Sequence, residues 1–384
     1  MELNRKIIYY AEFLYSIPIS FAYFINSSFI ASLTNEKFVG IVYALGALTS
    51  ILALIYASKI FRRLGGYKFL IVVTFLDVLS FLSLALIKNT WILVSAFILG
   101  IALNTLIIFS LDEILKIFSQ SSVTGRVRGI YIMLSNLPLI LIQLLIYVTV
   151  LGKFSYREIY FTGFLTMLFF LITSLLTFKN LPDPNYDRKN PTRYMQDFFR
   201  NKNLARAFGL TFLLQFFYCS MVIYTPIYLY SYLHFSWSQI GIIFTIMLLP
   251  FLFLPIGCGT YADKIGERKI LMFGFTVMAL ATLSLFFITK NTILIWATLL
   301  FITRIGAATV EPMADTYFFK HIKSKNEEFI SVYRSASPAA YIATPFIALA
   351  VFYIVPSFNF IFLVLGIVML FGIYLASTIE KGDI

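Results

Sequence analysis

Three ionisable side chains occur within one otherwise apolar stretch, residues 291–319. Arg304, Glu311 and Asp315 are spaced by seven and four residues, so on a helix they share one face over about two to three turns. Glu311 is suited to take up a proton or a cationic group, and Pro312 removes a backbone hydrogen bond beside it, which favours a bend. Arg304 carries a planar fork of donors that could hold a carboxylate or a phosphate. Alternatively, it acts as a counter-ion that lowers the pKa of Glu311.

A purely structural role competes with this chemistry. Arg334 lies about two turns into a later apolar segment, at a depth comparable with Glu311. Either Glu311 or Asp315 therefore has a potential partner in Arg334, because a charge left unpaired in an apolar setting is costly. In this alternative the ion pair only helps to close one side of the protein.

Other acidic residues lie near the ends of apolar runs. Asp112 and Glu113 have an interfacial depth, which favours a role in closing the protein over contact with a substrate. Their expected partners are Arg62 and Arg63. Glu12, about one turn inside the first run, either extends its carboxylate to the interface or lines a cavity.

The composition sets the environment of all these charges. Of 384 residues, 60% are hydrophobic and 12% are charged, against roughly 25% charged in an ordinary soluble domain. The mean hydropathy is +0.88, and 30 basic plus 18 acidic side chains are too few to cover a soluble protein of this size. A soluble enzyme, a disordered chain and a disulfide-stapled secreted module are excluded. The sequence predicts an integral membrane protein.

Apolar runs long enough to cross a membrane recur along the chain. A spanning helix needs about 20 residues, since each rises about 1.5 Å through about 30 Å of hydrocarbon. The runs lack the alternation, over about ten residues, of a membrane barrel. We therefore expect an all-α membrane protein with twelve transmembrane helices, at residues 7–32, 36–58, 68–87, 91–116, 127–152, 157–178, 204–233, 237–261, 270–289, 291–319, 328–355 and 357–378.

Lysine and arginine are distributed unevenly between the two sides that these spans define. Of the 30, 24 fall in one set of alternating segments and 5 in the other, and Arg304 lies inside a span. Because cytoplasmic loops retain positive charge, we predict a multi-pass protein of the cell membrane with both termini in the cytoplasm. The net charge of +12 then reflects topology and attraction to anionic lipids, and it needs no nucleic-acid partner.

A polar segment with three prolines interrupts the apolar pattern near the midpoint. Its second part, Thr192–Arg200, has apolar residues spaced for a helix that lies along the membrane surface. The sequence therefore predicts an N-terminal six-helix bundle at 1–178, a cytoplasmic linker at 179–203 and a C-terminal six-helix bundle at 204–384.

The two predicted bundles share short sequence patterns. Tyr56-Ala-Ser-Lys-Ile60 corresponds to Tyr261-Ala-Asp-Lys-Ile265, and Lys88-Asn-Thr90 corresponds to Lys290-Asn-Thr292. The second match has an offset of 202 residues, and at the same offset Glu113 falls on Asp315 and Tyr131 on Tyr333. These matches indicate an internal duplication and hence two pseudo-symmetric bundles.

One of these patterns carries a family resemblance. Gly259-Thr-Tyr-Ala-Asp263-Lys-Ile-Gly266-Glu-Arg268-Lys269 resembles the signature loop of the major facilitator superfamily, with a glycine, an aspartate and a second glycine followed by basic residues. Parallel six-helix repeats are also found in that superfamily. The first half departs from the signature, with Ser58 in place of the usual aspartate, and the fifth span lacks the glycine-rich pattern of the superfamily's drug antiporters.

The resemblance implies roles for further residues. The signature loop is expected to lock an outward-open state, so the cytoplasmic gate comprises Asp263, Lys264, Arg268, Arg62, Arg63, Asp112, Glu113, Asp315 and Arg334. Helices 1, 4, 7 and 10 of the superfamily line the central path. The implied substrate or proton pathway therefore includes Arg304, Glu311, Glu12, Tyr15, Tyr23, Asn26, Asn104, Gln215, Tyr218 and Tyr224. Each tyrosine alone also suits an interfacial anchor.

The implied activity is secondary transport of a small solute by alternating access about a midplane site. An ion gradient or the solute's own gradient would drive it, with proton coupling through Glu311 as a hypothesis. Export of amphipathic or organic compounds is favoured because the pathway candidates are largely aromatic and apolar. Import of a sugar or an organic anion, which rests on Arg304, is the alternative.

Two rivals belong to other classes: a non-transporting membrane sensor and a membrane enzyme that acts on lipids. We expect no enzymatic activity and a monomer surrounded by membrane lipids. The sequence predicts no cofactor and no metal, because His234 and His321 lie near opposite membrane faces and no nucleotide or zinc motif is present.

Overall fold

The computed structural model describes residues 2–23, 25–34, 36–118, 124–149, 155–179, 191–322, 328–355 and 357–379. The regular structure in these ranges is helical, and 11 helical segments are long and apolar enough to cross a membrane. This architecture agrees with the predicted all-helical membrane protein.

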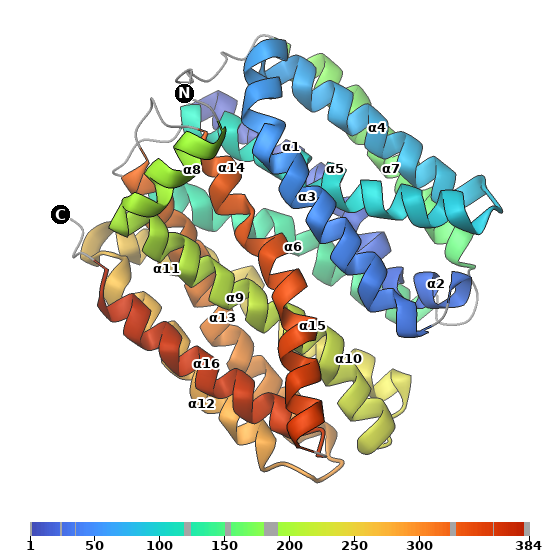
Figure 1. Cartoon of the computed structure of the whole chain (residues 1–384), viewed down its shortest axis with the longest axis vertical. Coiled ribbons are helices and arrows are strands. Elements are labelled where there is room, and N and C mark those ends of the chain that lie inside the picture. The colour runs from blue at the N-terminus through green and yellow to red at the C-terminus, as the bar shows by residue number, and fades with distance from the viewer. Residues whose placement is uncertain are drawn as a thin grey trace. The chain divides into compact units, whose positions relative to one another are not determined.

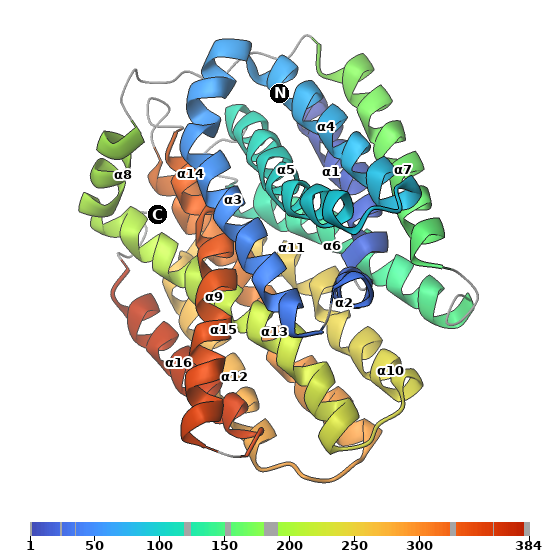
Figure 2. The ribbon, with the colours of Figure 1, turned by 45° about the vertical axis from the view of Figure 1, so that its right-hand side comes forward.

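Figures 1 and 2 show these helices, coloured in the order of the chain. The N-terminal part of the chain forms α1 (Glu2–Tyr23), α2 (Asn26–Leu33), α3 (Glu36–Leu64), α4 (Gly66–Leu86), α5 (Thr90–Ile117), α6 (Thr124–Thr149), α7 (Tyr156–Thr177) and α8 (Pro191–Arg200). The C-terminal part forms α9 (Lys202–Ile227), the π-helical turn η2 (Tyr228–Tyr232), α10 (Trp237–Leu248), α11 (Pro250–Ile265), α12 (Glu267–Phe286), α13 (Ile293–His321), α14 (Phe329–Arg334), α15 (Ala336–Ile354) and α16 (Phe360–Ser377).

The first predicted span is wrong as one continuous helix. In place of a helix over 7–32, α1 ends at Tyr23 and α2 begins at Asn26, and α1 is not one of the 11 segments apolar enough to span. The polar content of this region explains the difference. The hydroxyls of Ser16 and Ser20 donate to backbone carbonyls one turn back, and the side-chain oxygen of Asn26 accepts a hydrogen bond from Tyr160 at 2.7 Å.

Two glycines occupy equivalent places in the two halves of the chain. Gly65 joins α3 to α4 and Gly266 joins α11 to α12, and both have φ of 80°. L-residues with a side chain rarely adopt this left-handed conformation, so glycine is required at each turn. The same turn at positions 201 residues apart is a structural counterpart of the sequence repeat.

The chain forms two compact units that do not follow the midpoint of the sequence. One contains Met1–Ser119, Leu134–Arg200 and Ile322–Ile342, and the other contains Gln120–Met133, Asn201–His321 and Ala343–Ile384. The start of α6 therefore belongs with the C-terminal helices, whereas α14 and the start of α15 belong with the N-terminal helices. We call these two segments, residues 120–133 and 322–342, the exchanged segments. The predicted division of the chain at 179–203 did not include them, and the division into two six-helix bundles stays a prediction.

Each unit has its own packing. In the first unit α4 lies against α5 and α7, α3 lies against α5, and α1 lies against α7. In the second unit α12 packs between α13 and α16, and α13 also contacts α9, α10 and α11, so that most of α13 is buried (Figure 1). Because α13 carries the three spaced charges of the sequence analysis, its burial places them inside the unit.

The crossing of α12 and α13 depends on two facing glycines. A Cβ atom added at Gly306 would lie 2.5 Å from the Gly274 carbonyl oxygen, whereas a Cβ at Gly257 would meet nothing within 4 Å. We expect Gly306→Ala to lower the free energy of unfolding by about 1–3 kcal/mol, because the helices must separate to admit the methyl group. Denaturant unfolding in detergent micelles measures this, with Gly257→Ala as the matched control. Equal stability of the two variants would contradict the close crossing.

Candidate functional site

A tyrosine of α9 and two charged residues of α13 meet inside the second unit. The hydroxyl of Tyr218 donates a hydrogen bond to Oε2 of Glu311 at 3.0 Å. The guanidinium carbon of Arg304 lies 5.3 Å from the centre of the same tyrosine ring. Tyr218 therefore contacts the Glu311 carboxylate through its hydroxyl and the Arg304 guanidinium through its ring.

Arg304 is enclosed by aromatic rings. The residue is only 3% exposed, and its guanidinium carbon is also 5.3 Å from the ring centre of Phe217. Phe251 lies 6.1 Å from Tyr218, ring centre to ring centre. Cation–π contacts of this kind favour a guanidinium strongly when water is excluded. The rings thus orient Arg304 and supply an apolar surface next to its charge.

The spacing of Arg304 and Glu311 along α13 determines how far apart their charged groups lie. Seven residues separate Arg304 from Glu311, about 10.5 Å along the helix axis. A guanidinium that can bind an anion and a carboxyl group that can accept a proton therefore lie two turns apart on one buried helix. Gln215 lies one turn before Cys219 on α9 and is partly buried, in the same unit as this site.

The pathway residues predicted in the first unit form their own polar contacts. The hydroxyl of Tyr15 donates to the backbone carbonyl of Asn104 at 3.2 Å and to the side-chain oxygen of the same residue. The Tyr15 ring packs against Phe170 at 5.4 Å. Glu12 is buried, and Tyr15 lies within electrostatic reach of both Glu12 and Asp77. The structure therefore brings Glu12, Tyr15 and Asn104 together, whereas Asn26 pairs with Tyr160.

Asp77, deep in α4, lies next to a glycine of the neighbouring helix α5. The residue is 1% exposed, and a Cβ added at Gly100 of α5 would lie 3.8 Å from its Oδ1. Among the described residues, its Oδ2 has no hydrogen-bond partner. A buried carboxyl oxygen without a hydrogen-bond partner is costly in this setting, which makes Asp77 a candidate for a functional role.

Asp112, fully buried at the end of α5, forms an ion pair with Arg334 of α14 within the first unit. The sequence analysis assigned Arg62 or Arg63 as its partner. The partner seen in the structure is Arg334, and the side chains of Arg62 and Arg63 lie exposed at the end of α3. A gate contact of Asp112 or Glu113 with either arginine stays a prediction. The neighbouring Glu113 is likewise fully buried.

A second ion pair lies in the second unit. Arg128, near the start of α6, approaches Asp315 of α13 with 3.9 Å between Nη1 and Oδ2. Its guanidinium carbon stands 3.3 Å from the ring centre of Phe319 and 5.6 Å from that of Tyr131. This contact forms because the start of α6 belongs to the second unit and brings a fully buried arginine to α13. The pairing of Asp315 with Arg334 stays a prediction.

The two ion pairs occupy similar places in the two halves of the chain, although their residues do not coincide at the offset of the sequence repeat. Each joins an acid near the end of one long helix, α5 or α13, to an arginine near the start of an exchanged segment. Each also joins residues from opposite halves of the sequence. The segment that carries Arg128 packs closely, since a Cβ at Gly129 would lie 2.3 Å from the Pro255 carbonyl oxygen of α11.

Sequence reasoning did not include Arg128 among the functional residues. Arg128 lies at the very start of the predicted span 127–152 and was counted among the basic residues of the cytoplasmic side, where an arginine needs no buried partner. The aromatic neighbours Phe217 and Phe251 had no distinguishing signal among 42 phenylalanines.

The signature-loop residues lie at the end of α11 and the start of α12. Lys264 is exposed and Arg268 is partly exposed, and the side chain of Asp263 lies outside what the structure describes. At the same junction Glu267 forms an ion pair with Lys320 of α13 at 2.7 Å. Among the described residues, no group of three or more His, Cys, Asp or Glu is arranged to hold a metal ion.

Comparison with known proteins decides the family. The family model described as the Major Facilitator Superfamily matches residues 8–244 and residues 207–381. The chain belongs to this superfamily. It is a transporter rather than an enzyme, which confirms the predicted family and class and removes the lipid-acting enzyme from consideration. Among the curated proteins, none matches the chain.

A solved structure shares the fold of this superfamily member. The crystal structure of the human organic anion transporter MFSD10 (TETRAN) superposes with a TM-score of 0.77 at 13% sequence identity, covering 97% of this chain and 98% of that one. At this identity the comparison establishes the fold alone, and it confirms the predicted helical architecture.

The ion pair of Asp112 and Arg334 provides a test of this geometry. Asp112→Asn should lower the free energy of unfolding by about 3 kcal/mol, because it removes the negative charge of an ion pair whose acid is fully buried. A double-mutant cycle with Arg334→Gln, followed by unfolding in mixed detergent micelles, should give a coupling energy of about 1–3 kcal/mol. Lys68→Gln, at an exposed position, is the control. A coupling energy near zero would mean that the pair does not form.

Proposed function

We propose that this superfamily transporter carries amphipathic organic anions and couples their movement to protons through Glu311. The proposal rests on one observation, the contact of Tyr218 with both Arg304 and Glu311. Arg304 offers a fork of donors to a carboxylate, sulfonate or phosphate group. The adjoining rings of Phe217, Tyr218 and Phe251 suit an apolar body attached to such a group.

The proton enters the proposal through the same tyrosine. The Tyr218 hydroxyl donates a hydrogen bond to Glu311 at 3.0 Å, and Glu311 is the proposed proton carrier. An arriving organic anion that occupies Arg304 removes positive charge from the vicinity, and this favours protonation of the carboxyl group. Protonation of Glu311 and binding of an anion at Arg304 would therefore assist each other, which is the requirement for coupled transport.

Alternating access requires that one side be closed while the other is open. The Asp112–Arg334 and Asp315–Arg128 pairs are the proposed closing contacts, together with the signature-loop residues Asp263, Lys264 and Arg268. We place them on the cytoplasmic side, with both termini, because 24 of the 30 lysines and arginines fall in the segments of that side. Breaking the two pairs would then accompany opening toward the cytoplasm.

Because proton and anion would bind together, they would move in the same direction, and an inward proton gradient would drive uptake. Export, which the aromatic pathway candidates favoured at the level of the sequence, is the alternative and would need a gradient of the opposite sense or the solute's own gradient. The aromatic surroundings of Arg304 favour an anion with an apolar body over a sugar, which needs many hydroxyl partners. The structurally similar MFSD10 is described as an organic anion transporter, and organic anions are the substrate class proposed here.

The substrate class is tested by ligand-induced stabilisation. In a thermal-shift screen of amphipathic organic anions, organic cations and sugars, we expect only the anions to raise the melting temperature, and we expect Arg304→Gln to abolish the effect. A hundredfold excess over Kd corresponds to about 2.7 kcal/mol of stabilisation. Arg157→Gln, at a partly exposed position of α7, is the charge-matched control. Stabilisation by cations that survives Arg304→Gln would contradict the assignment.

Proton coupling is tested by flux in proteoliposomes with an imposed pH gradient. An anion identified by the screen should accumulate in response to the gradient, and Glu311→Gln should reduce gradient-driven flux at least about tenfold, because the amide cannot carry a proton. Glu158→Gln is the control, since glutamine also completes the capping box at the start of α7. Flux that is independent of the gradient and unchanged in Glu311→Gln would exclude coupling. Binding without any flux would favour the sensor.

A further inference from the structure

The linker helix α8 has two faces with different surroundings. Tyr194 and Phe198, four residues apart, are buried in the first unit. Phe199 is 47% exposed, and Arg193 and Arg200 are exposed as well. The buried residues of the inner face hold α8 against its unit. The exposed aromatic and basic residues of the outer face have no role in the proposed transport.

The inner face attaches α8 to two other helices of its unit. The Tyr194 hydroxyl donates to the backbone carbonyl of Ile55 in α3 at 2.8 Å, and the Phe198 ring meets Phe329 of α14 at 5.6 Å. Burial raises the pKa of the Tyr194 phenol, so it remains a neutral donor at physiological pH. These contacts fix the rotation of α8 about its own axis and thereby fix which side chains face outward.

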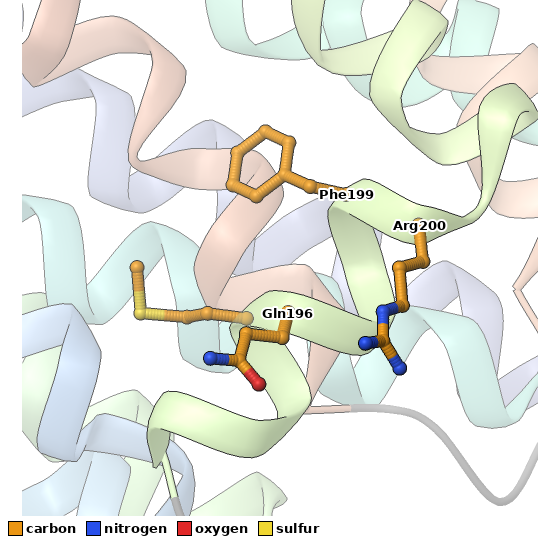
Figure 3. Close-up of a pocket in the computed structure, with 4 residues that line it drawn as sticks. Gln196, Phe199 and Arg200 are labelled. Carbon is orange, nitrogen blue, oxygen red and sulfur yellow. The ribbon is translucent and has the colours of Figure 1, made fainter.

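The outer side chains separate into an apolar strip and a basic strip. Met195 and Phe199 are four residues apart and lie on one flank. Arg193 and Arg200 are seven apart and lie on the next flank together with the half-buried Asp197, which leaves that flank with a net positive charge. Figure 3 shows Phe199 and Arg200 leaving the helix in different directions, with Gln196 beside them. Met195, Gln196, Phe199 and Arg200 line an open pocket of about 640 Å³.

The contacts also fix the height of α8 relative to the spanning helices. Ile55 lies in the apolar part of α3, one turn before Lys59, where the basic end of that helix begins. At its other end, Asn201 alone separates α8 from the spanning helix α9. Both constraints place α8 at the boundary between hydrocarbon and head groups.

We propose that the outer face of α8 binds anionic lipids, with Phe199 and Met195 in the acyl-chain region and Arg193 and Arg200 at the lipid phosphates. A helix with adjoining apolar and basic strips at this height lies in the interface and prefers negatively charged lipids. Basic residues there are attracted to the surface potential of such lipids. Because α8 also contacts α14, which carries Arg334, a bound lipid would stabilise the segment that pairs with Asp112.

The experiment uses the full chain with Phe199→Trp as a local reporter. The protein is reconstituted into vesicles containing acyl-brominated phosphatidylglycerol or acyl-brominated phosphatidylcholine, and the fluorescence is compared with that of the parent chain, which has three tryptophans. We expect bromine to quench the introduced indole, about twofold more strongly on phosphatidylglycerol because the arginines attract its head group. Arg193→Gln with Arg200→Gln should remove this preference. Lys68→Gln with Lys269→Gln removes the same charge elsewhere and should leave the preference unchanged.

Two outcomes would overturn the proposal. If the introduced indole emits as in water and is quenched by neither lipid, the outer face meets water or a soluble partner. If both lipids quench equally and the arginine substitutions change nothing, the helix is an apolar anchor without a head-group site. The measurement requires no transport, so it is independent of the proposed substrate and coupling.

Discussion

An ionised side chain that leaves water for the interior of a membrane protein costs several kcal/mol unless nearby groups replace its hydration. The buried charges of this chain follow that constraint. Asp112 has Arg334, Asp315 has Arg128, and Arg304 lies against two aromatic rings. Each of these contacts requires that a second helix reach the charged group at its depth in the protein. The buried charges therefore constrain which helix ends lie together. The exchanged segments of α6 and α14 are the clearest result.

The same constraint explains why the charged residues of α13 have different surroundings. Asp315 lies near the end of the helix and has a partner from another segment, which suits a contact that opens and closes. Arg304 and Glu311 lie deeper and are linked by one tyrosine of α9, which suits groups that exchange ligands. The aromatic rings keep water away from Arg304, and they strengthen its attraction for an anion. In our proposal, a single buried helix thus carries both kinds of site.

Much of this could be predicted from the sequence because spans follow from hydropathy alone. The ends of α5 and α13 fall within a few residues of the predicted bounds, and the surface helix at 192–200 corresponds to α8. The sequence singled out Arg304, Glu311 and Tyr218 as candidates, since charges and polar rings in apolar runs are conspicuous, and the structure brings the three together. The partner of Asp315 could not be predicted, because depth along a span says nothing about which neighbouring helix is adjacent. The separation of α1 from α2 was missed because the polar residues of α1 are too dispersed to interrupt an apolar run.

The exchange of helix ends has a mechanical consequence. Both helices that pass from one compact unit to the other contain a proline just beyond the crossing, Pro138 in α6 and Pro345 in α15. Each proline removes one backbone hydrogen bond from its helix and so lowers the resistance to bending there. If one unit turns against the other, the strain falls on these two places, and the short segments bearing Arg128 and Arg334 can keep their positions while the remainder of each helix tilts.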